Sequence, residues 1–260
     1  MSELAWKTAI TKVEPNKLVV RGYRLDELIG KVSYSQMVYL LFKGELPSPE
    51  VGRVVEAILV SSVDHGTTPP SVLSALTVAS TGAPLNAAVA AGILSISKFH
   101  GGAIEDCMLI LKQAKQIMDE QKLNFEEAAA IVIKQFRSEK KRLSGFGHRY
   151  HTNDPRTQKL FAVARENGLA GDYVKLALTF VDQLQKITGK HLPLNVDGAI
   201  AALLCELDID PVLANAFFMI ARVPGIVAHV YEEKTRYKPM RKIHPTDVEY
   251  DGPEEREFKQ

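Results

Sequence analysis

The stretch LDELIGKVSYSQMVYLLFKG, residues 25–44, contains the pattern that decides the fold of this chain. Its apolar residues recur at three- and four-residue intervals, the spacing that places side chains on one face of an α-helix. Gly44 and Pro47 follow the apolar run and indicate that the helix ends there. We therefore expect a helix over this stretch.

The same periodicity returns along most of the 260 residues. Only KLVVRGY, residues 17–23, predicts a strand, and we find neither βαβ alternation nor an internal repeat. The sequence therefore predicts an all-α protein. Further helices are expected within 85–99, 107–118, 125–142, 173–188, 196–207 and 211–235.

Several helix ends are marked by their residues. Asn124 and Glu127 have the spacing of a capping box, and Asp172 is expected to open the next helix. Gly189 is placed to end that helix. Pro224 lies inside the last apolar segment, where it predicts a kink or a break.

Composition excludes some classes of protein. The hydrophobic content is 46%, and 32 basic side chains stand against 31 acidic ones, for a formal charge of +1. This balance gives no reason to expect nucleic acid or a membrane as partner. The two cysteines, Cys107 and Cys205, lie in apolar segments without zinc-ligand spacing, and no secretory signal precedes them. We expect a cytoplasmic protein with reduced thiols and no metal site.

Reactive side chains concentrate where the helical pattern breaks, as they often do on loops that a rigid scaffold presents. The most informative break is GFGHRYHTNDPR, residues 145–156. Gly145 and Gly147 allow the backbone to approach a ligand, and His148 can exchange protons near neutral pH. Arg149 and Arg156 suit bidentate contact with carboxylates or phosphates.

Four other residues are candidates, each with a plainer alternative. His65 in VDHGTTPPS could be a surface or capping histidine, and His100 in FHGGA could simply favour a helix C-terminus. Asp197 in LNVDGA could be an N-cap. Arg222 lies in an apolar helix, so it needs either a buried partner or an anionic ligand. The remaining candidates, His151 and His229, could be ordinary polar-face residues.

Histidines, an aspartate and arginines at helix ends suggest acid–base chemistry on a small anionic organic acid. This combination alone does not select one enzyme class. The order of the motifs is more specific. DHG, HGGA, GFGHRYHTNDPR, NVDG and ARVPGIVAHVYEE, together with the earlier LLFKGELP, resemble the citrate synthase superfamily in order and approximate spacing.

The resemblance implies catalytic roles for three residues. His100 matches the histidine that hydrogen-bonds the thioester oxygen of the acetyl-CoA enol or enolate. His148 matches the histidine that exchanges a proton with the oxaloacetate carbonyl, which becomes the tertiary hydroxyl of the citryl product. Asp197 matches the carboxylate that moves a proton to or from the acetyl methyl group.

The resemblance also implies a set of binding residues. His65 matches a histidine that binds the oxaloacetate or citryl group, and Arg156 and Arg222 match arginines that hold its carboxylates. Arg149 is expected to assist them. The backbone that meets the adenine of coenzyme A is formed by Gly145, Phe146 and Gly147.

Three departures point to the citryl-CoA lyase branch of this superfamily, which includes the C-terminal domain of ATP-citrate lyase. The chain is short, DHGTTPPS replaces the DHELNAS phrase of citrate synthases, and His244-Pro245 stands where they have an Arg-Pro pair. That pair reaches the substrate of a neighbouring subunit, and Arg241 and Lys242 are the candidates to replace it here. The implied reaction is cleavage of citryl-CoA to acetyl-CoA and oxaloacetate.

The resemblance sets further expectations. Coenzyme A enters as part of the substrate, and no cofactor is covalently bound. The family fold is a large helical domain, here residues 1–103 and 206–260, with a small helical domain inserted at 104–205. A homo-oligomer is expected, and because no P-loop is present, a separate citryl-CoA synthetase would supply the substrate. The alternatives are a short citrate or 2-methylcitrate synthase, or a non-catalytic acyl-CoA-binding regulatory subunit.

Overall fold

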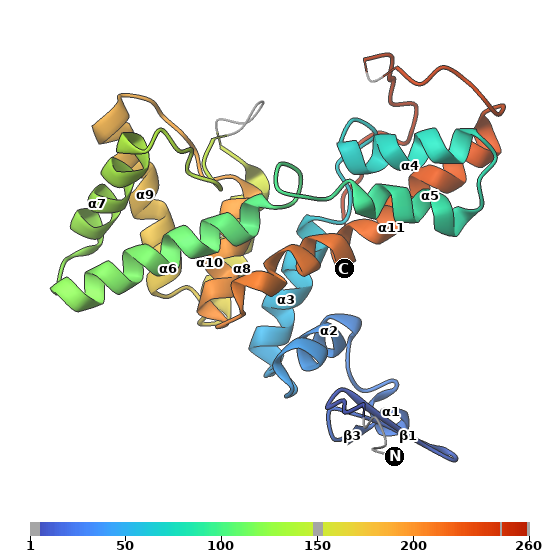
Figure 1. Ribbon diagram of the computed structural model, residues 1–260, viewed down its shortest axis with the longest axis horizontal. Helices are drawn as coiled ribbons and strands as arrows, with labels where there is room; N and C mark the ends of the chain where they lie inside the picture. The colour runs from blue at the N-terminus through green and yellow to red at the C-terminus, as the bar shows by residue number, and fades with distance from the viewer. Residues whose placement is uncertain (1–5, 148–152, 245, 259–260) are drawn as a thin grey trace, which may run out of the picture. The chain divides into compact units, whose positions relative to one another are not determined.

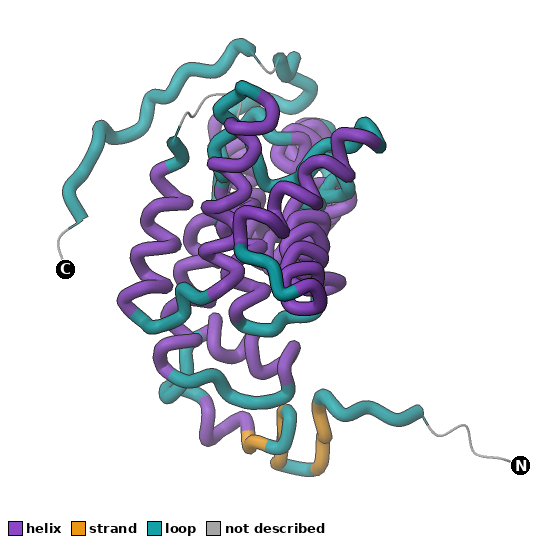
Figure 2. Tube along the Cα trace, turned by 90° about the vertical axis from the view of Figure 1, so that its left-hand side faces the viewer, coloured by secondary structure: helices purple, strands orange, loops and turns teal. Residues whose placement is uncertain are grey.

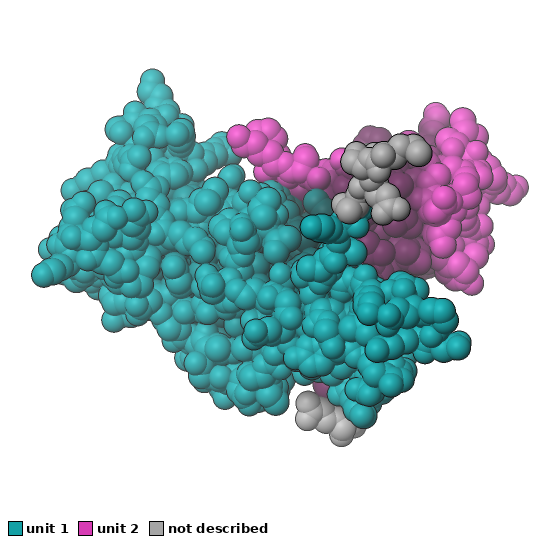
Figure 3. All heavy atoms as spheres, turned by 60° about the horizontal axis from the view of Figure 1, so that its bottom comes forward, with its two compact units in different colours: residues 1–62, 101–221 teal, residues 63–100, 222–260 magenta. Residues whose placement is uncertain are grey.

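The computed structural model describes residues 6–147, 153–244 and 246–258. Helices dominate these residues, and the only strands among them lie near the N-terminus (Figures 1 and 2). The predicted all-α class is confirmed. The chain forms two compact units, coloured in Figure 3: unit 1 comprises residues 1–62 and 101–221, and unit 2 comprises residues 63–100 and 222–260.

Unit 1 begins with a small antiparallel sheet in the order β1-β2-β3. Thr11 pairs with Val20 across the first hairpin, and Val20 pairs with Tyr23 across the second. The Arg21 guanidinium donates to the carbonyl oxygen of Leu41, which ties the sheet to the helix that follows. The strands are β1 (Thr11–Glu14), β2 (Lys17–Val20) and β3 (Tyr23–Arg24).

The stretch 25–44 contains two helices rather than the one expected. Helix α1 (Leu25–Leu28) is a single turn, and α2 (Tyr34–Lys43) starts afresh after Gly30, whose φ of 79° is left-handed. Ser33 and Gln36 close a complete capping box at the start of α2. The apolar period survives the interruption because α1 and α2 bury their apolar residues in one cluster with Val20. Gly44 ends α2 in the left-handed conformation, as predicted.

The core of unit 1 surrounds α10 (Val196–Glu206), in which every residue from Gly198 to Cys205 is buried. This helix packs against α6, α8 and α9, while α7 packs on α6 and α9. Alanines and glycine on α10 allow these close approaches, and leucines fill the remaining space. The other helices of unit 1 are α3 (Pro49–Ser61), α6 (Ala103–Gln121), α7 (Phe125–Ser138), α8 (Pro155–Glu166), α9 (Asp172–Thr188) and the 3₁₀ turn η1 (Pro211–Leu213).

Unit 2 is built on α4 (Pro70–Ser80), α5 (Leu85–Leu94) and part of α11 (Ala214–Arg236). Its core joins valine, leucine and alanine side chains of α4 and Ala88 of α5 to Ile226 and Val230 of α11. A Cβ atom at Gly92 of α5 would lie 2.8 Å from the carbonyl oxygen of Ser71, so this glycine permits the close packing expected of a small-residue helix.

Helix α11 runs through Pro224 without the break that the sequence suggested. Its residues up to Ala221 belong to unit 1, and those from Arg222 belong to unit 2. The segment Pro211–Arg236 is also long and apolar enough to cross a membrane, by length and composition alone. Phe217, Ile226 and Val230 of this segment are buried, as in the core helix of a folded domain. The division at residues 104 and 205 stays a prediction.

Candidate active site

His100 is held at the start of α4 by Ser71. The imidazole Nε2 lies 2.8 Å from Ser71 Oγ and accepts the backbone N–H of Ser71 at 3.3 Å. A short antiparallel bridge between Ser97 and His100 fixes the backbone of the histidine. The hydrogen bond from Ser71 N–H requires a lone pair on Nε2, so the proton of the neutral ring resides on Nδ1.

The surroundings of His100 favour this neutral form. Burial lowers the pKa of His100, and the positive charges of Arg222 and His65 lower it further. A neutral imidazole with its proton on Nδ1 is a hydrogen-bond donor for an oxygen that gains negative charge. The alternative of a helix C-terminal histidine is wrong, because α5 ends at Leu94 and His100 contacts the first turn of α4 instead.

His65, His100 and Arg222 form one electrostatic group in unit 2. His65 is exposed in the loop before α4, whereas Arg222 is only 3% exposed on α11. Both residues act on the pKa of His100, which places their charges close to its ring. A buried arginine beside two histidines suits a small polycarboxylate. The structure therefore brings together three of the residues predicted from distant parts of the sequence.

In unit 1, Asp197 lies in the first turn of α10 but does not cap it. The N-cap is Asn195, whose Oδ1 accepts the backbone N–H of Gly198 at 3.1 Å. The capping alternative for Asp197 is therefore wrong. Its half-buried carboxylate is held at the N-terminus of a buried helix, a position that favours negative charge.

The glycine loop pairs with the segment just before α10. Gly147 N–H donates to the carbonyl of Pro193 at 2.7 Å, and Asn195 N–H donates to the carbonyl of Gly145 at 3.0 Å. The Asn195 side-chain amide also donates to the carbonyl of Gly147. Asn195 thus ties the loop 145–147 to the helix start that carries Asp197. The ring of Phe146 stacks on Phe180, so this residue anchors the loop through its side chain.

The backbone conformation at positions 145 and 147 requires glycine. Their φ angles are 88° and 87°, in the left-handed region that glycine adopts without strain. A Cβ atom at Gly145 would also lie 2.5 Å from Cys107 Sγ and 2.9 Å from the Cα of Gly198. The loop can therefore lie directly on α6 and α10 only because Gly145 has no side chain.

Arg156 is oriented by a buried carboxylate. Its Nε and one terminal nitrogen donate to the two oxygens of Asp154 at 3.1 and 2.9 Å. Asp154 is 1% exposed and also caps α8 by accepting Arg156 N–H. Paired in this way, the guanidinium presents its remaining N–H groups in a fixed direction. The predicted residues His148 and Arg149 lie outside the described residues.

Three supporting residues are not among the candidates chosen from the sequence, although Asp64 and Asp154 lie inside the DHG and GFGHRYHTNDPR motifs. Ser71 and Asp154 orient His100 and Arg156, and Asp64 contacts His229 at 3.1 Å, although 165 positions separate the latter pair. Arg241, a candidate for the cross-subunit contact, donates to both oxygens of Glu233 within its own chain, and the cross-subunit role stays a prediction. Among the described residues, no group of three His, Cys, Asp or Glu side chains is arranged to hold a metal ion.

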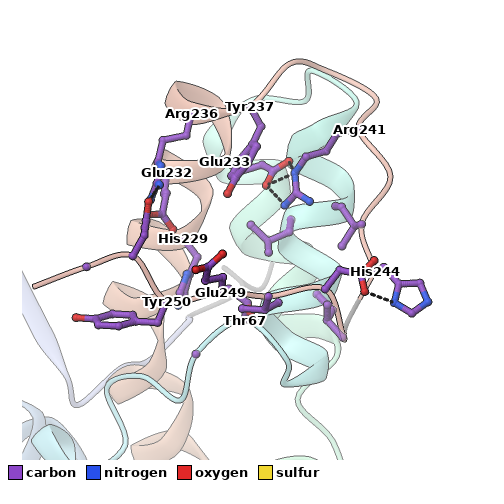
Figure 4. Close-up of a pocket in the computed structure, with 18 of the residues that line it drawn as sticks. Thr67, His229, Glu232, Glu233, Arg236, Tyr237, Arg241, His244, Glu249 and Tyr250 are labelled. Atoms are coloured by element: carbon purple, nitrogen blue, oxygen red, sulfur yellow. Dashed lines mark hydrogen bonds and ion pairs between the residues drawn. The ribbon is translucent and has the colours of Figure 1, made fainter. Parts of the chain in front are cut away.

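Figure 4 shows Arg241 and Glu233 in the wall of a cavity of about 1020 Å³ in unit 2. Helix α11 contributes His229 and Glu232 to this cavity, and the segment after it contributes His244, Glu249 and Tyr250. Thr67 reaches the same cavity from the loop that follows His65. The segment after α11 therefore lines one cavity together with the loop before α4.

Comparison with known proteins places these motifs in a family. Residues 47–246 match the model of the citrate synthase C-terminal domain. The beta chain protein 2 of ATP-citrate synthase from Arabidopsis thaliana is 27% identical over 255 residues, and the citrate synthase of Haloferax volcanii is 30% identical over 227. The alignments cover 92% and 86% of this chain but only 39% and 56% of those proteins.

Solved structures show the same likeness. Citryl-CoA lyase from Hydrogenobacter thermophilus is 44% identical with a TM-score of 0.83, and the match covers 98% of this chain and 97% of that one. ATP citrate lyase from Methanothrix soehngenii shares the fold, with a TM-score of 0.82 at 22% identity over 98% of this chain and 43% of that one. The chain belongs to the citrate synthase family.

Proposed function

We propose that this protein is a citryl-CoA lyase that cleaves citryl-CoA to acetyl-CoA and oxaloacetate. The observation that carries the proposal is the correspondence with the citryl-CoA lyase of Hydrogenobacter thermophilus, which extends over nearly the whole of both chains. The presence of His65, His100, Asp197, Arg156 and Arg222 in settings suited to acid–base chemistry supports it.

Cleavage breaks the bond between the carbinol carbon of the citryl group and the methylene carbon next to the thioester. His148 accepts the proton of the tertiary hydroxyl as that oxygen becomes the ketone of oxaloacetate. The electron pair of the broken bond moves into the thioester and forms an enol or enolate. Asp197, as a carboxylic acid, then gives its proton to the methylene carbon, which becomes the methyl group of acetyl-CoA. The resulting carboxylate is reprotonated and His148 releases the hydroxyl proton, so the turnover gains and loses no net proton. No cofactor is consumed, and coenzyme A takes part only within the substrate.

His100 stabilises the oxygen on which charge develops. Because Ser71 engages Nε2, the proton of the neutral ring resides on Nδ1, and we assign this N–H group as the donor to the thioester oxygen. One preorganised donor of this kind contributes about 3 kcal/mol to a transition state. The lowered pKa of His100 keeps the ring neutral. The ring can therefore donate the hydrogen on Nδ1 while Nε2 continues to accept from Ser71.

The arginines hold the ionised ends of the substrate. Arg222, Arg156 and Arg149 bind carboxylates of the substrate, together with His65. The bidentate contact with Asp154 fixes Arg156 before substrate arrives, which reduces the entropy lost on binding. The backbone of residues 145–147 meets the adenine of coenzyme A.

The cellular setting belongs to the same proposal. The enzyme works in the cytoplasm as a homo-oligomer and receives citryl-CoA from a separate synthetase. Sedimentation of the purified protein tests the oligomeric state. The partner is tested by reconstitution, in which citrate, ATP and coenzyme A give oxaloacetate only when a candidate synthetase is added.

The central experiment is a product assay with chemically prepared citryl-CoA. A lyase yields acetyl-CoA and oxaloacetate in equal amounts, detected by coupled oxidation of NADH and by chromatography. Free citrate and coenzyme A as the main products would contradict the proposal. They would favour the second candidate, a citrate or 2-methylcitrate synthase, to which the Haloferax volcanii citrate synthase similarity also points.

A third candidate is a non-catalytic acyl-CoA-binding regulatory subunit. The position of Asp197 disfavours this role, because its carboxylate neither caps α10 nor is needed for binding an anion. Binding of citryl-CoA with no product formed under any condition would favour this candidate instead.

A further inference from the structure

His65 lies in a loop whose neighbours are fastened to α11. Asp64, directly before it, places Oδ1 3.1 Å from His229 Nε2 and accepts the backbone N–H of Gly66 on Oδ2 at 3.0 Å. Both carboxylate oxygens are therefore engaged. One contacts α11, and the other accepts the N–H group of the residue that follows His65. The backbone on both sides of His65 is linked through this single carboxylate.

The same loop packs directly against Gly225 of α11. A Cβ atom at this position would lie 2.4 Å from the carbonyl oxygen of Val63 and 2.8 Å from Asp64 Oδ1. Real Cβ atoms do not approach oxygen so closely, so any larger residue must push the loop away. Gly225 follows Pro224 within a continuous helix. A glycine is therefore needed here for the close approach of the loop and not for a turn.

One face of α11 therefore serves two purposes. Residues three and four apart share a helix face, so Arg222, Gly225 and His229 lie in one row. Arg222 acts electrostatically on the same imidazole as His65, while Gly225 and His229 contact the residues that precede His65. A single helix thus carries an anion-binding arginine and also the two residues that support the loop of an anion-binding histidine.

We propose that His229 and Gly225 are positioning residues. They hold His65 at the place relative to Arg222 that lets both residues bind a carboxylate of the substrate. This inference rests on the proposed function of His65 and Arg222. His229 acts through Asp64 and needs no contact with substrate. Its ion pair with Asp64 is partly exposed, with side-chain exposures of 17% and 39%, and pairs of this kind add little to global stability. Its loss should therefore loosen the loop without unfolding the protein.

The test compares His229→Ala, which removes the donor, with His229→Gln, whose side-chain amide can still donate to Asp64. We expect His229→Ala to raise KM for citryl-CoA at least about tenfold while kcat changes little, because His65 binds a group that is charged before and after cleavage. His229→Gln should restore KM to near the wild-type value. Gly225→Ala should raise KM in the same direction. His191→Ala, which removes an exposed histidine bonded to Gln185, is the matched control and should change nothing.

Melting temperatures are measured for all variants, and assays are run well below the lowest. Amide hydrogen exchange of residues 63–67 supplies a readout that does not need turnover. Exchange there should be at least about tenfold faster in His229→Ala and return to the wild-type rate in His229→Gln. Wild-type exchange in His229→Ala, or a defect that glutamine does not rescue, would overturn the inference. A wild-type protein that fails to cleave citryl-CoA would overturn the proposed function, while the exchange data would still test the positioning.

Discussion

The backbone N–H of Ser71 donates to Nε2 of His100, and the Ser71 hydroxyl lies 2.8 Å from the same nitrogen. Because the first contact survives any substitution except proline, Ser71→Ala isolates the contribution of the hydroxyl. We expect kcat for citryl-CoA cleavage to fall about tenfold at nearly constant KM, as a less well oriented ring donates poorly in the transition state. Ser74→Ala on the same helix is the control. An unchanged kcat in Ser71→Ala would show that the backbone alone orients His100.

The charge of Arg222 should be visible in the titration of His100. Its positive charge disfavours the imidazolium form and helps lower the pKa of His100. Arg222→Gln should therefore raise the pKa of His100 toward its ordinary value, so that the neutral ring is lost at a higher pH as the solution is acidified. NMR titration of the imidazole protons measures this without turnover. Arg236→Gln, farther along the helix, should leave the titration curve in place.

Substitution of Asp197 should mainly lower turnover, whereas substitution of Asn195 should mainly lower the free energy of unfolding. Asp197→Asn keeps the shape of the side chain and should lower turnover at least about tenfold with little change in the free energy of unfolding. Asn195→Ala removes the N-cap of α10 and should cost about 1 kcal/mol of stability. Equal stability losses in the two variants would assign Asp197 a structural role.

His148→Ala should lower turnover at least about tenfold and leave coenzyme A binding measurable, because the imidazole handles the hydroxyl proton rather than the nucleotide. Steady-state kinetics and calorimetric titration with coenzyme A check the two halves of this expectation. An unchanged rate would remove His148 from the mechanism.

Gly145 and Gly189 both have left-handed backbones but differ in the space around them. A Cβ atom at Gly189 meets nothing within 4 Å, so Gly189→Ala should cost only about 1 kcal/mol of backbone strain. Gly145→Ala adds a collision with Cys107 and Gly198 and should cost about 3 kcal/mol or more. Chemical denaturation measures both. Similar losses in the two variants would mean that the loop 145–147 can move away from α6 and α10 at little cost.

Glu206 should leave a signature in the pH dependence of stability. Burial raises the pKa of Glu206 above its ordinary value of 4.5, although backbone N–H groups at the start of α9 partly oppose the effect. A raised folded-state pKa means that its contribution to stability is present at low pH and is lost as the pH rises from 4.5 through the raised value. Glu206→Gln should remove this component. The difference in unfolding free energy between variant and wild type, measured from pH 4 upward, should therefore change over that interval and become constant above it.

The helical class and many helix ends could be predicted because they depend on local chemistry. The Asn124 and Glu127 capping box and the Gly189 end of α9 are both present, since caps involve residues a few positions apart. The single helix predicted over residues 25–44 is wrong because Ser33 and Gln36 start a new one, while the apolar period hides the interruption. Pro224 does not break α11, because the packing of Ile226 and Val230 in the unit 2 core supports the turn that follows it.

For the candidate site, the sequence could supply the reactive residues but not their supports. His100 and Arg156 stand out by residue type and motif, whereas Ser71 is one of many serines. Contacts between Ser71 and His100 or between Asp64 and His229 join segments far apart along the chain, and such pairings are decided by tertiary packing. The capping alternative for Asp197 was locally reasonable, and only the geometry of Asn195 removes it.

The two thiols, finally, give the protein a built-in reporter of its own unfolding. Cys107 and Cys205 are both buried, and burial raises the pKa of Cys107 well above its ordinary value and that of Cys205 to about 12. Because thiolate is the species that reacts with alkylating and disulfide reagents, neither sulfur should be modified while the helices of unit 1 remain packed. The rate of labelling would then record how often this core opens, without any added probe or engineered residue.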